Sequence, residues 1–256
     1  MPIRVDQAGG GIVTVTIDRP AKRNALDEGM YRHLARLWPE LAADSAVRCV
    51  ILTGAGRAFC SGADLAARLI ELPDVDELVD SALLKTVFMP VPVIAAIDGP
   101  CVAGGFELAL GCDVRLCTPQ ARFGLPEPRW GIFPSGGGAR KLAGEIGYAR
   151  ATELLLTGRL FGADEALAMG LAAKVVAQEE LPRAAFEIAR LIAANSPEAV
   201  HALKRYLHEA KAPTPELQAL EKRLTDRVRS TDSSEGIAAF LEKRQPVYRR
   251  LGAVPL

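Results

Sequence analysis

The sequence lacks the features that mark membrane and exported proteins. No run of about 18 apolar residues occurs, because charged residues, prolines and glycines interrupt the most apolar stretch, 91–110. The opening residues, MPIRVDQAGG, have neither the apolar run of a secretory signal nor the Arg/Ser-rich character of a transit peptide. We therefore expect no membrane-spanning helix, no membrane partner and a cytoplasmic location.

Cysteine and histidine are scarce, and their spacing does not suit a metal site. The 5 cysteines form no CxxC pair, and the 3 histidines lie far from them in the sequence. An odd number of cysteines without such pairs favours buried thiols in a reducing compartment over a disulfide framework or a zinc site. We expect no metal.

Neither sign of charge is in excess. The 31 Lys and Arg residues balance 31 Asp and Glu residues, so the formal net charge is +0 and nucleic acid is not an expected partner. Hydrophobic residues make up 49% of the chain and charged residues 24%, which is typical of a folded protein. The 256 residues suffice for one large domain, or for one domain with a small appendage.

Strand and helix patterns alternate in the first part of the chain. Apolar runs predict strands over 12–17, 47–52, 91–97, 114–117 and 121–124. Apolar residues from Leu26 to Leu41 recur at spacings of three and four, which predicts an amphipathic helix with Asp27 as its N-cap. Residues 66–90 have a variable helical pattern, and another helix is expected from residue 106.

From about residue 139 the patterns are almost entirely helical. The expected helices cover 149–157, 163–169, 181–194, 197–210, 215–229 and 235–244. This order predicts an α/β core over residues 1–195 and a helical C-terminal section over 196–256.

Three common catalytic or nucleotide-binding motifs are incomplete. GAG at 54–56 follows a predicted strand, but Phe59 stands where the third glycine of GxGxxG belongs. SGGGARK at 135–141 lacks the Lys-Ser/Thr ending of a phosphate loop. The histidines lie on helical patterns, so a Ser–His–Asp triad is disfavoured.

Two units each combine a strand, a glycine turn and a predicted helix. CSGADL (60–65) follows the strand at 47–52, and AGGFEL (103–108) follows the strand at 91–97. Each leaves backbone N–H groups unpaired where a helix begins. Two such donors that point at one oxygen form an oxyanion hole, although either unit alone is also typical of an ordinary turn.

Two glutamates lie in apolar surroundings. Glu107 occurs in FELALG and Glu127 in FGLPEPRWGI. Such a residue either stabilises a helix N-terminus or has a shifted pKa suited to proton transfer. If both face one pocket, their charges shift each other's pKa values and separate an acid from a base. Spacing alone does not show that they meet.

Six segments that follow one another along nearly the whole chain carry a resemblance to a known family. They are DRPAKRNALD (18–27), VILTGAGRAFCSGADL (50–65), PVIAAIDGPCVAGGFELALGCD (92–113), ARFGLPEPRWGIFPSGGG (121–138), LTGRLFGADEALAMGLAAKVV (156–176) and EGIAAFLEKRQPVY (235–248). Together they resemble the enoyl-CoA hydratase/isomerase family, or crotonase superfamily. The resemblance implies an α/β fold, a spiral of ββα units with a helical C-terminal trimerisation section, and a homotrimer or a dimer of trimers.

The resemblance also implies roles for individual residues. The N–H groups of Ala63 and Gly104 would polarise an acyl thioester carbonyl, and Glu107 and Glu127 match the two catalytic glutamates of the hydratases. Lys22 and Arg23 match a segment that passes near the CoA phosphates. Phe240 and Lys243 match a motif that can reach a neighbouring subunit's CoA. The other expected substrate-binding residues are Ser61, Gly62, Asp64, Leu65, Gly105, Trp130 and Ser135.

The implied reaction is the addition of water to a 2-enoyl-CoA to give a 3-hydroxyacyl-CoA. Glu107 is assigned to the side of the water, where it takes a proton, and Glu127 to the side of Cα, where it delivers one. No cofactor is needed, because coenzyme A is part of the substrate. Other acyl-CoA reactions on the same scaffold stay open: isomerisation, hydrolysis, decarboxylation, carnitinyl-CoA dehydration and an aromatic enoyl-CoA lyase reaction. A non-catalytic acyl-CoA-binding or RNA-binding member is a further alternative.

Two positions bear on the substrate. Ser135 replaces a family glycine whose N–H holds the catalytic water, and serine keeps that N–H unless the backbone needs a positive φ. Trp130 either shapes the acyl pocket or packs beneath the loop.

Overall fold

A six-stranded sheet forms the centre of the computed structural model, which describes residues 2–209 and 214–248. The strand order is β1-β2-β3-β4-β6-β9; β1 is antiparallel to β2, and the other neighbours are parallel. These strands are β1 (Ile3–Gly9), β2 (Ile12–Ile17), β3 (Cys49–Gly54), β4 (Val93–Ile97), β6 (Val114–Cys117) and β9 (Lys174–Val175). A smaller sheet has the order β5-β7-β8 and consists of β5 (Pro100–Val102), β7 (Arg122–Gly124) and β8 (Phe161–Gly162).

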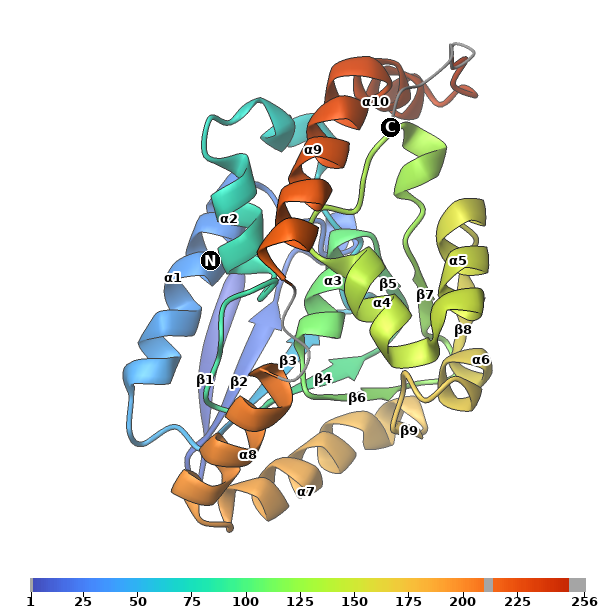
Figure 1. Cartoon of the computed structure of the whole chain (residues 1–256). Coiled ribbons are helices and arrows are strands. Elements are labelled where there is room, and N and C mark those ends of the chain that lie inside the picture. Colours follow the sequence, from blue (N-terminus) through green and yellow to red (C-terminus); the bar gives the residue numbers. More distant parts are fainter. Residues whose placement is uncertain (1, 210–213, 249–256) are drawn as a thin grey trace.

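Helices cover both faces of the large sheet (Figure 1). They are α1 (Glu28–Ala43), α2 (Val75–Ala82), α3 (Gly104–Gly111), α4 (Gly138–Ile146), α5 (Tyr148–Thr157), α6 (Ala163–Ala168), α7 (Leu181–Ala193), α8 (Pro197–Glu209), α9 (Pro215–Thr231) and α10 (Ser233–Glu242). Short 3-10 helices are η1 (Pro20–Lys22), η2 (Leu65–Ala67), η3 (Leu69–Glu71), η4 (Glu127–Trp130) and η5 (Gln178–Glu180).

The alternating pattern of β2 divides its side chains between two hydrophobic cores. Val13, Val15 and Ile17 lie in the larger core, which also contains the apolar faces of α1 and α3. Ile12 lies in the smaller core, formed between the sheet and α7. The period of two therefore places a core on each face of the sheet, as such a period requires.

Helix α1 forms as its sequence predicts. The Asp27 side chain accepts a hydrogen bond from the Met30 N–H at 3.0 Å and so caps the first turn. The apolar face is buried, and Trp38 on it donates from Nε1 to the Ala82 carbonyl at 2.9 Å. This bond fixes α2, whose Val75 and Val79 line a large cavity, against α1.

The predicted fold class, an α/β core with a helical C-terminal region, is confirmed. Strands β1, β5, β8 and β9 were not predicted. The region 66–90, expected to be helical but variable, contains α2 and η3, with the end of η2 at its start. The division at residues 195 and 196 stays a prediction, and residues 210–213 and 249–256 of the C-terminal section lie outside the described residues.

Candidate active site

The two glycine turns lie against each other. Cys60 and Cys101 form a parallel bridge, and the Val102 N–H donates to the Cys60 carbonyl at 3.0 Å. Gly62 has φ +88, and a Cβ there would lie 2.8 Å from the Cβ of Ala103. A Cβ on Gly105 would lie 2.2 Å from the Cys60 carbonyl oxygen. Glycine is therefore needed at both positions for the turns to approach this closely.

The N–H groups of Ala63 and Gly104 donate to no acceptor among the described residues. Leu26 pairs with the groups on either side of Ala63: its N–H donates to the Gly62 carbonyl, and its carbonyl accepts from the Asp64 N–H. Gly104 is the first residue of α3, so its N–H has no partner within the helix. Ala103, which precedes it, has φ +52, a strained conformation for a residue with a side chain.

The two turns lead into different structures. AGGFEL opens α3, a helix of 8 residues, whereas CSGADL leads only into the 3-residue 3-10 helix η2. The expectation of a helix after each turn is wrong for the first one. Asp64 caps η2 by accepting from the Ala66 N–H, so the helix dipole supports the Gly104 N–H and not that of Ala63.

Both amides open into a cavity of about 820 Å³, which we call the Glu107 cavity. It is also lined by most of the site residues expected from the sequence: Lys22, Arg23, Ser61, Asp64, Leu65, Glu107, Glu127, Trp130, Ser135, Phe240 and Lys243. Gly62 and Gly105 do not line it, because their backbones pack into the contact between the turns. The structure thus brings together segments from the beginning, middle and end of the chain.

Glu107 lies on α3 with only 4% of its surface exposed. The Gly138 N–H, at the start of α4, donates to Oε1 at 3.0 Å. A Cβ on Gly136 would lie 2.6 Å from Oε2, so the loop before α4 closes directly over the carboxyl group. Burial raises the pKa of Glu107 to about 7, against the opposing effects of the Gly138 N–H and the Lys141 charge.

Glu127 begins η4 and is 7% exposed. Its Oε2 is buried and has no hydrogen-bond partner among the described residues. Burial and the charge of Glu107 raise the pKa of Glu127 well above its ordinary range. Because both carboxyl groups line one cavity and both pKa values are raised, the pair takes up one proton readily and holds it between the two side chains.

Hydrogen bonds hold the segment that carries Lys22 and Arg23 beside the first turn. The Ser61 N–H donates to the Arg23 carbonyl at 3.1 Å. The Asn24 side chain donates to the carbonyls of Ala55 and Ala58, at 2.9 and 2.6 Å. The side chains of Lys22 and Arg23 are exposed, so their charges lie at the mouth of the cavity.

Helix α10 packs over η4 and closes the other side of the cavity. Ser233 Oγ donates to the Gly131 carbonyl at 2.8 Å. Trp130 and Phe240 meet edge to face, with ring centroids 5.1 Å apart. Trp130 therefore both lines the cavity and packs against another ring. Phe240 and Lys243 line the cavity of their own chain, whereas the resemblance implied contact with a neighbouring subunit's CoA.

Sequence reasoning missed three contributors. Tyr31 lines the cavity, and its hydroxyl would lie 3.0 Å from a Cβ on Gly104. Leu83 forms another part of the wall, and Gly138 provides the amide that binds Glu107. The three consecutive glycines at 136–138, where α4 begins, were the sequence feature that could have pointed to the Gly138 amide. Ser135 does not have a positive φ, so the serine fits its backbone conformation.

Within residues 2–209 and 214–248, no group of three or more His, Cys, Asp or Glu side chains could hold a metal ion. The same residues contain no helix with the length and apolar character needed to cross a membrane.

Comparison with known proteins identifies the family of the chain. Residues 7–250 match the family model described as enoyl-CoA hydratase/isomerase. The chain belongs to the enoyl-CoA hydratase/isomerase family. Enoyl-CoA hydratase EchA19 of Mycobacterium tuberculosis is 40% identical over 250 residues, which cover 94% of each chain. This confirms the family that the six motifs indicated.

Two further proteins are similar to the chain over nearly its whole length. The carnitinyl-CoA dehydratase of Proteus mirabilis is 39% identical over 254 residues, covering 94% of this chain and 95% of that one. The crystal structure of carnitinyl-CoA hydratase from Mycobacterium avium superimposes with a TM-score of 0.88 at 32% identity and covers 97% of this chain and 98% of that one. The family's fold therefore extends over nearly the whole chain.

Proposed function

We propose that the chain is an enoyl-CoA hydratase, which adds water to a 2-enoyl-CoA to give a 3-hydroxyacyl-CoA. The observation that carries the proposal is that two buried carboxyl groups and two unpaired amides line one cavity. General acid–base chemistry at a thioester needs these groups: a base, an acid, and donors for the carbonyl oxygen.

The amides of Ala63 and Gly104 bind the thioester oxygen. Negative charge builds on this oxygen when a nucleophile adds at Cβ, and donors fixed beforehand stabilise that charge more than they stabilise the substrate. The close contact between the two turns fixes the donors. Each donor of this kind contributes about 3 kcal/mol to transition-state stabilisation.

The two glutamates divide the proton transfers. Glu107, which matches the glutamate that the resemblance assigns to the water, takes a proton from water as the oxygen bonds to Cβ. Glu127, whose pKa is raised by burial and by the charge of Glu107, delivers the proton of the pair to Cα. The product gains one OH and one H, and a proton passed from Glu107 to Glu127 restores the starting state.

The shape of the cavity suits an acyl-CoA. Its inner wall is apolar and can receive an acyl chain, and its mouth carries the exposed side chains of Lys22, Arg23, Arg68 and Lys243, which suit the CoA phosphates. The inner wall includes Leu69, Ile70, Val75, Val79, Ile132, Phe133 and Ile237. Coenzyme A enters as part of the substrate, so we propose no separate cofactor.

We also propose a homotrimer or a dimer of trimers, located in the cytoplasm. Large apolar side chains on α8 support the oligomer, because Leu203 is 65%, Tyr206 74% and Leu207 60% exposed in the single chain. Light scattering on the purified protein measures its mass, and a stable monomer would contradict the proposal.

The reaction is tested by mixing the protein with a short 2-enoyl-CoA. Hydration removes the ultraviolet absorbance of the conjugated thioester and adds the mass of one water, whereas isomerisation adds no mass. A Glu107→Gln/Glu127→Gln double variant should lose the activity. Glu40→Gln, on an exposed part of α1, is the matched control and should keep it. Equal activity in the wild type and the double variant would falsify the assignment.

A second candidate is dehydration of carnitinyl-CoA. It is favoured by the aromatic pair Trp130 and Phe240 in the cavity, because aromatic faces bind quaternary ammonium groups. The test compares kcat/KM for an enoyl-CoA that carries a trimethylammonium group with that for an uncharged enoyl-CoA of the same length. A preference for the charged substrate that Trp130→Ala removes supports this candidate. A preference for the uncharged substrate excludes it.

A further inference from the structure

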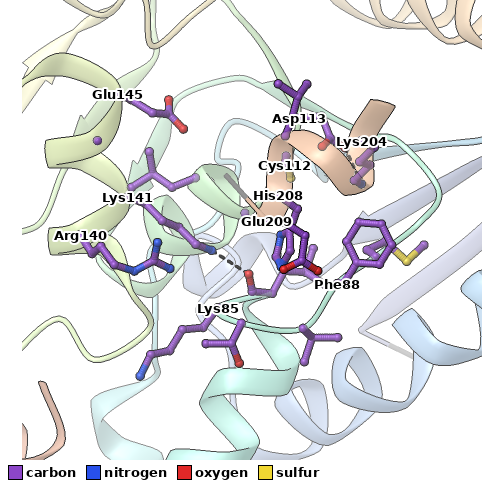
Figure 2. A pocket seen from close by; sticks show the side chains of 18 of the residues that line it. Lys85, Phe88, Cys112, Asp113, Arg140, Lys141, Glu145, Lys204, His208 and Glu209 are labelled. Carbon is purple, nitrogen blue, oxygen red and sulfur yellow. Dashed lines mark hydrogen bonds and ion pairs between the residues drawn. The ribbon is translucent and has the colours of Figure 1, made fainter. Parts of the chain in front are cut away.

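A second cavity, of about 1120 Å³, borders the C-terminal end of α3; we call it the Lys141 cavity. Figure 2 labels charged side chains of this cavity that come from α4, α8 and the loops around 85–88 and 112–113, and Arg115 of β6 lines it as well. Most of them are paired: Lys204 with Asp113, Arg115 with Glu145, Arg205 with Glu209 and Lys85 with Glu221. These ion pairs give most of its charged side chains a structural role.

Lys141 differs from these residues because it forms no ion pair within the described part of the chain. Its Nζ donates to the Leu84 carbonyl at 2.7 Å, the bond drawn as a dashed line in Figure 2. Leu84 has φ +52, which is strained for a branched apolar residue. The ammonium group therefore holds a turn in a conformation that its own residues disfavour.

This turn forms part of the wall between the two cavities. Leu84 and Lys85 line the Lys141 cavity, while Leu83 lines the Glu107 cavity. The Cδ1 of Leu83 would lie 2.8 Å from a Cβ on Gly136 and 3.6 Å from one on Gly104. Through Leu83, the position of the Leu84 carbonyl affects both the loop that covers Glu107 and the turn that carries the Gly104 amide.

Lys141 is also linked to Glu107 through α4 and α3. It lies three residues after Gly138, whose N–H binds the Glu107 carboxyl group. Its Nζ would lie 3.3 Å from a Cβ on Gly111, the last residue of α3, the helix that carries Glu107. The ammonium group thus lies beside the C-terminal end of α3, where a positive charge is favourable.

The charges around Glu107 make Lys141 the main nearby cation. Glu107 experiences the charges of Lys141 and Lys85, which favour its ionised form, and that of Glu221, which opposes it. Tyr31 and Glu127 also face it across the cavity. Lys141 in turn faces Arg140, Asp80 and Cys112, and burial lowers its pKa to about 8, so it is charged at neutral pH. Lys85 already pairs with Glu221.

We propose that Lys141 is a positioning residue for Glu107: its ammonium group stabilises the Glu107 carboxylate from the C-terminal side of α3 and fixes the 83–85 turn that packs over the site. The inference deepens the proposed function and rests on it for the meaning of the Glu107 carboxylate. It assigns Lys141 no contact with the substrate.

The test titrates Glu107 directly. In protein labelled with ¹³C at glutamate carboxyl groups, NMR follows the Glu107 signal, which is identified by its absence from Glu107→Gln. Lys141→Met should raise the titration midpoint of Glu107 by about one unit, and Lys141→Arg should restore it. The matched control is Lys204→Met, which removes a cation from the same cavity but one that is paired with Asp113; it should leave the midpoint in place. An unmoved midpoint in Lys141→Met overturns the proposal.

The second readout is the pH profile of kcat/KM. Lys141→Met should shift the acid limb of this profile to higher pH. The loss of kcat/KM is then severalfold near neutral pH and small at about pH 9, where Glu107 is ionised without the Lys141 charge. An equal loss at every pH indicates a general structural defect and overturns the proposal. If the wild type shows no hydration at all, the proposed function fails, while the NMR titration still decides the role of Lys141.

Discussion

The Glu107 cavity and the Lys141 cavity meet opposite ends of α3 and hold charge in different ways. In the Lys141 cavity, charges are paired: Lys204 Nζ lies 2.7 Å from Asp113 Oδ2, and Arg205 Nε lies 2.8 Å from Glu209 Oε1. In the Glu107 cavity, neither glutamate forms an ion pair among the described residues: Glu107 accepts a hydrogen bond from the Gly138 N–H, and Oε2 of Glu127 has no hydrogen-bond partner there. The Lys141 cavity is nevertheless the larger, at about 1120 Å³ against about 820 Å³.

The comparison teaches that unsatisfied charge indicates a reactive site better than volume does. A paired carboxylate is already stabilised and has little reason to exchange a proton. A buried carboxyl group without a counter-ion has a raised pKa and exchanges protons near neutral pH. The fold bears the cost of burying Glu107 and Glu127, which a purely structural role would not require.

The largest difference between the cavities is expected in the rate of the reaction. Glu107→Gln and Glu127→Gln should each lower kcat by about 10²–10⁴-fold, because each removes a proton-transfer group. The matched change in the other cavity is Glu145→Gln, which breaks the pair with Arg115. It should lower the melting temperature while leaving kcat nearly unchanged. Steady-state kinetics and thermal unfolding check both, and a comparable kcat loss in Glu145→Gln would remove the distinction.

A smaller effect on rate is expected from Gly136→Ala. The added methyl group would lie 2.6 Å from Glu107 Oε2, so the carboxyl group or the loop must shift, and we expect kcat to fall by about 10²-fold. Gly144→Ala, on the exposed side of α4, is the control, because a Cβ there meets nothing within 4 Å. It should keep full activity and stabilise the helix by up to about 1 kcal/mol. Unchanged kinetics in Gly136→Ala would show that Glu107 tolerates displacement.

The stability of the protein should also depend on pH through the buried carboxyl group of the Glu107 cavity. Burial raises the pKa of Glu107 from 4.5 to about 7, so the native state binds more protons than the unfolded state between these values. The free energy of unfolding therefore falls as the pH rises through this window, by up to about 3 kcal/mol from this residue.

Urea unfolding at about pH 5 and about pH 8 checks this expectation. Glu107→Gln lacks the ionisation, so its stability relative to the wild type should be higher at about pH 8 than at about pH 5. A difference that does not change with pH would show that burial of Glu107 carries no such cost.

The smallest effect is expected at the rim of the Lys141 cavity. Asp113 accepts hydrogen bonds from the Val93 N–H and from Lys204, each at 2.7 Å. Asp113→Asn keeps an acceptor for Val93 and loses only the charge, so we expect a loss of about 1 kcal/mol in stability and unchanged kcat. Chemical denaturation measures the first quantity and steady-state kinetics the second. A clear fall in kcat would mean that ion pairs in this cavity also serve the reaction.

Local pattern was sufficient to predict strands β2, β3, β4, β6 and β7 and most helices, but not β1, β5, β8 and β9. The alternation in β2 and the leucine spacing of α1 each reflect a face that must be buried. Strand β1 was missed because only its first residue is buried, so it carries no apolar period. The helix expected after CSGADL was wrong, since Asp64 closes a single 3-10 turn there.

Contacts between distant residues could not be predicted in the same way. The Gly138 N–H reaches Glu107 across 31 positions in sequence, and the Ser233 hydroxyl reaches Gly131 across 102. Neither bond leaves a periodic trace in the chain. Tyr31 was missed for a related reason: it lies on the buried face of α1, where an aromatic residue is indistinguishable from ordinary core.

The sequence alone determined the family, most of the helices, the more buried strands and the residue types available for chemistry, because these depend on local order along the chain. Only the tertiary structure decided that Glu107 and Glu127 share one cavity, that α10 of the same chain closes it, and that Lys141 lies behind it. The physical reason is that burial and pairing of charge depend on all the segments that surround a residue, and those segments meet only when the chain folds.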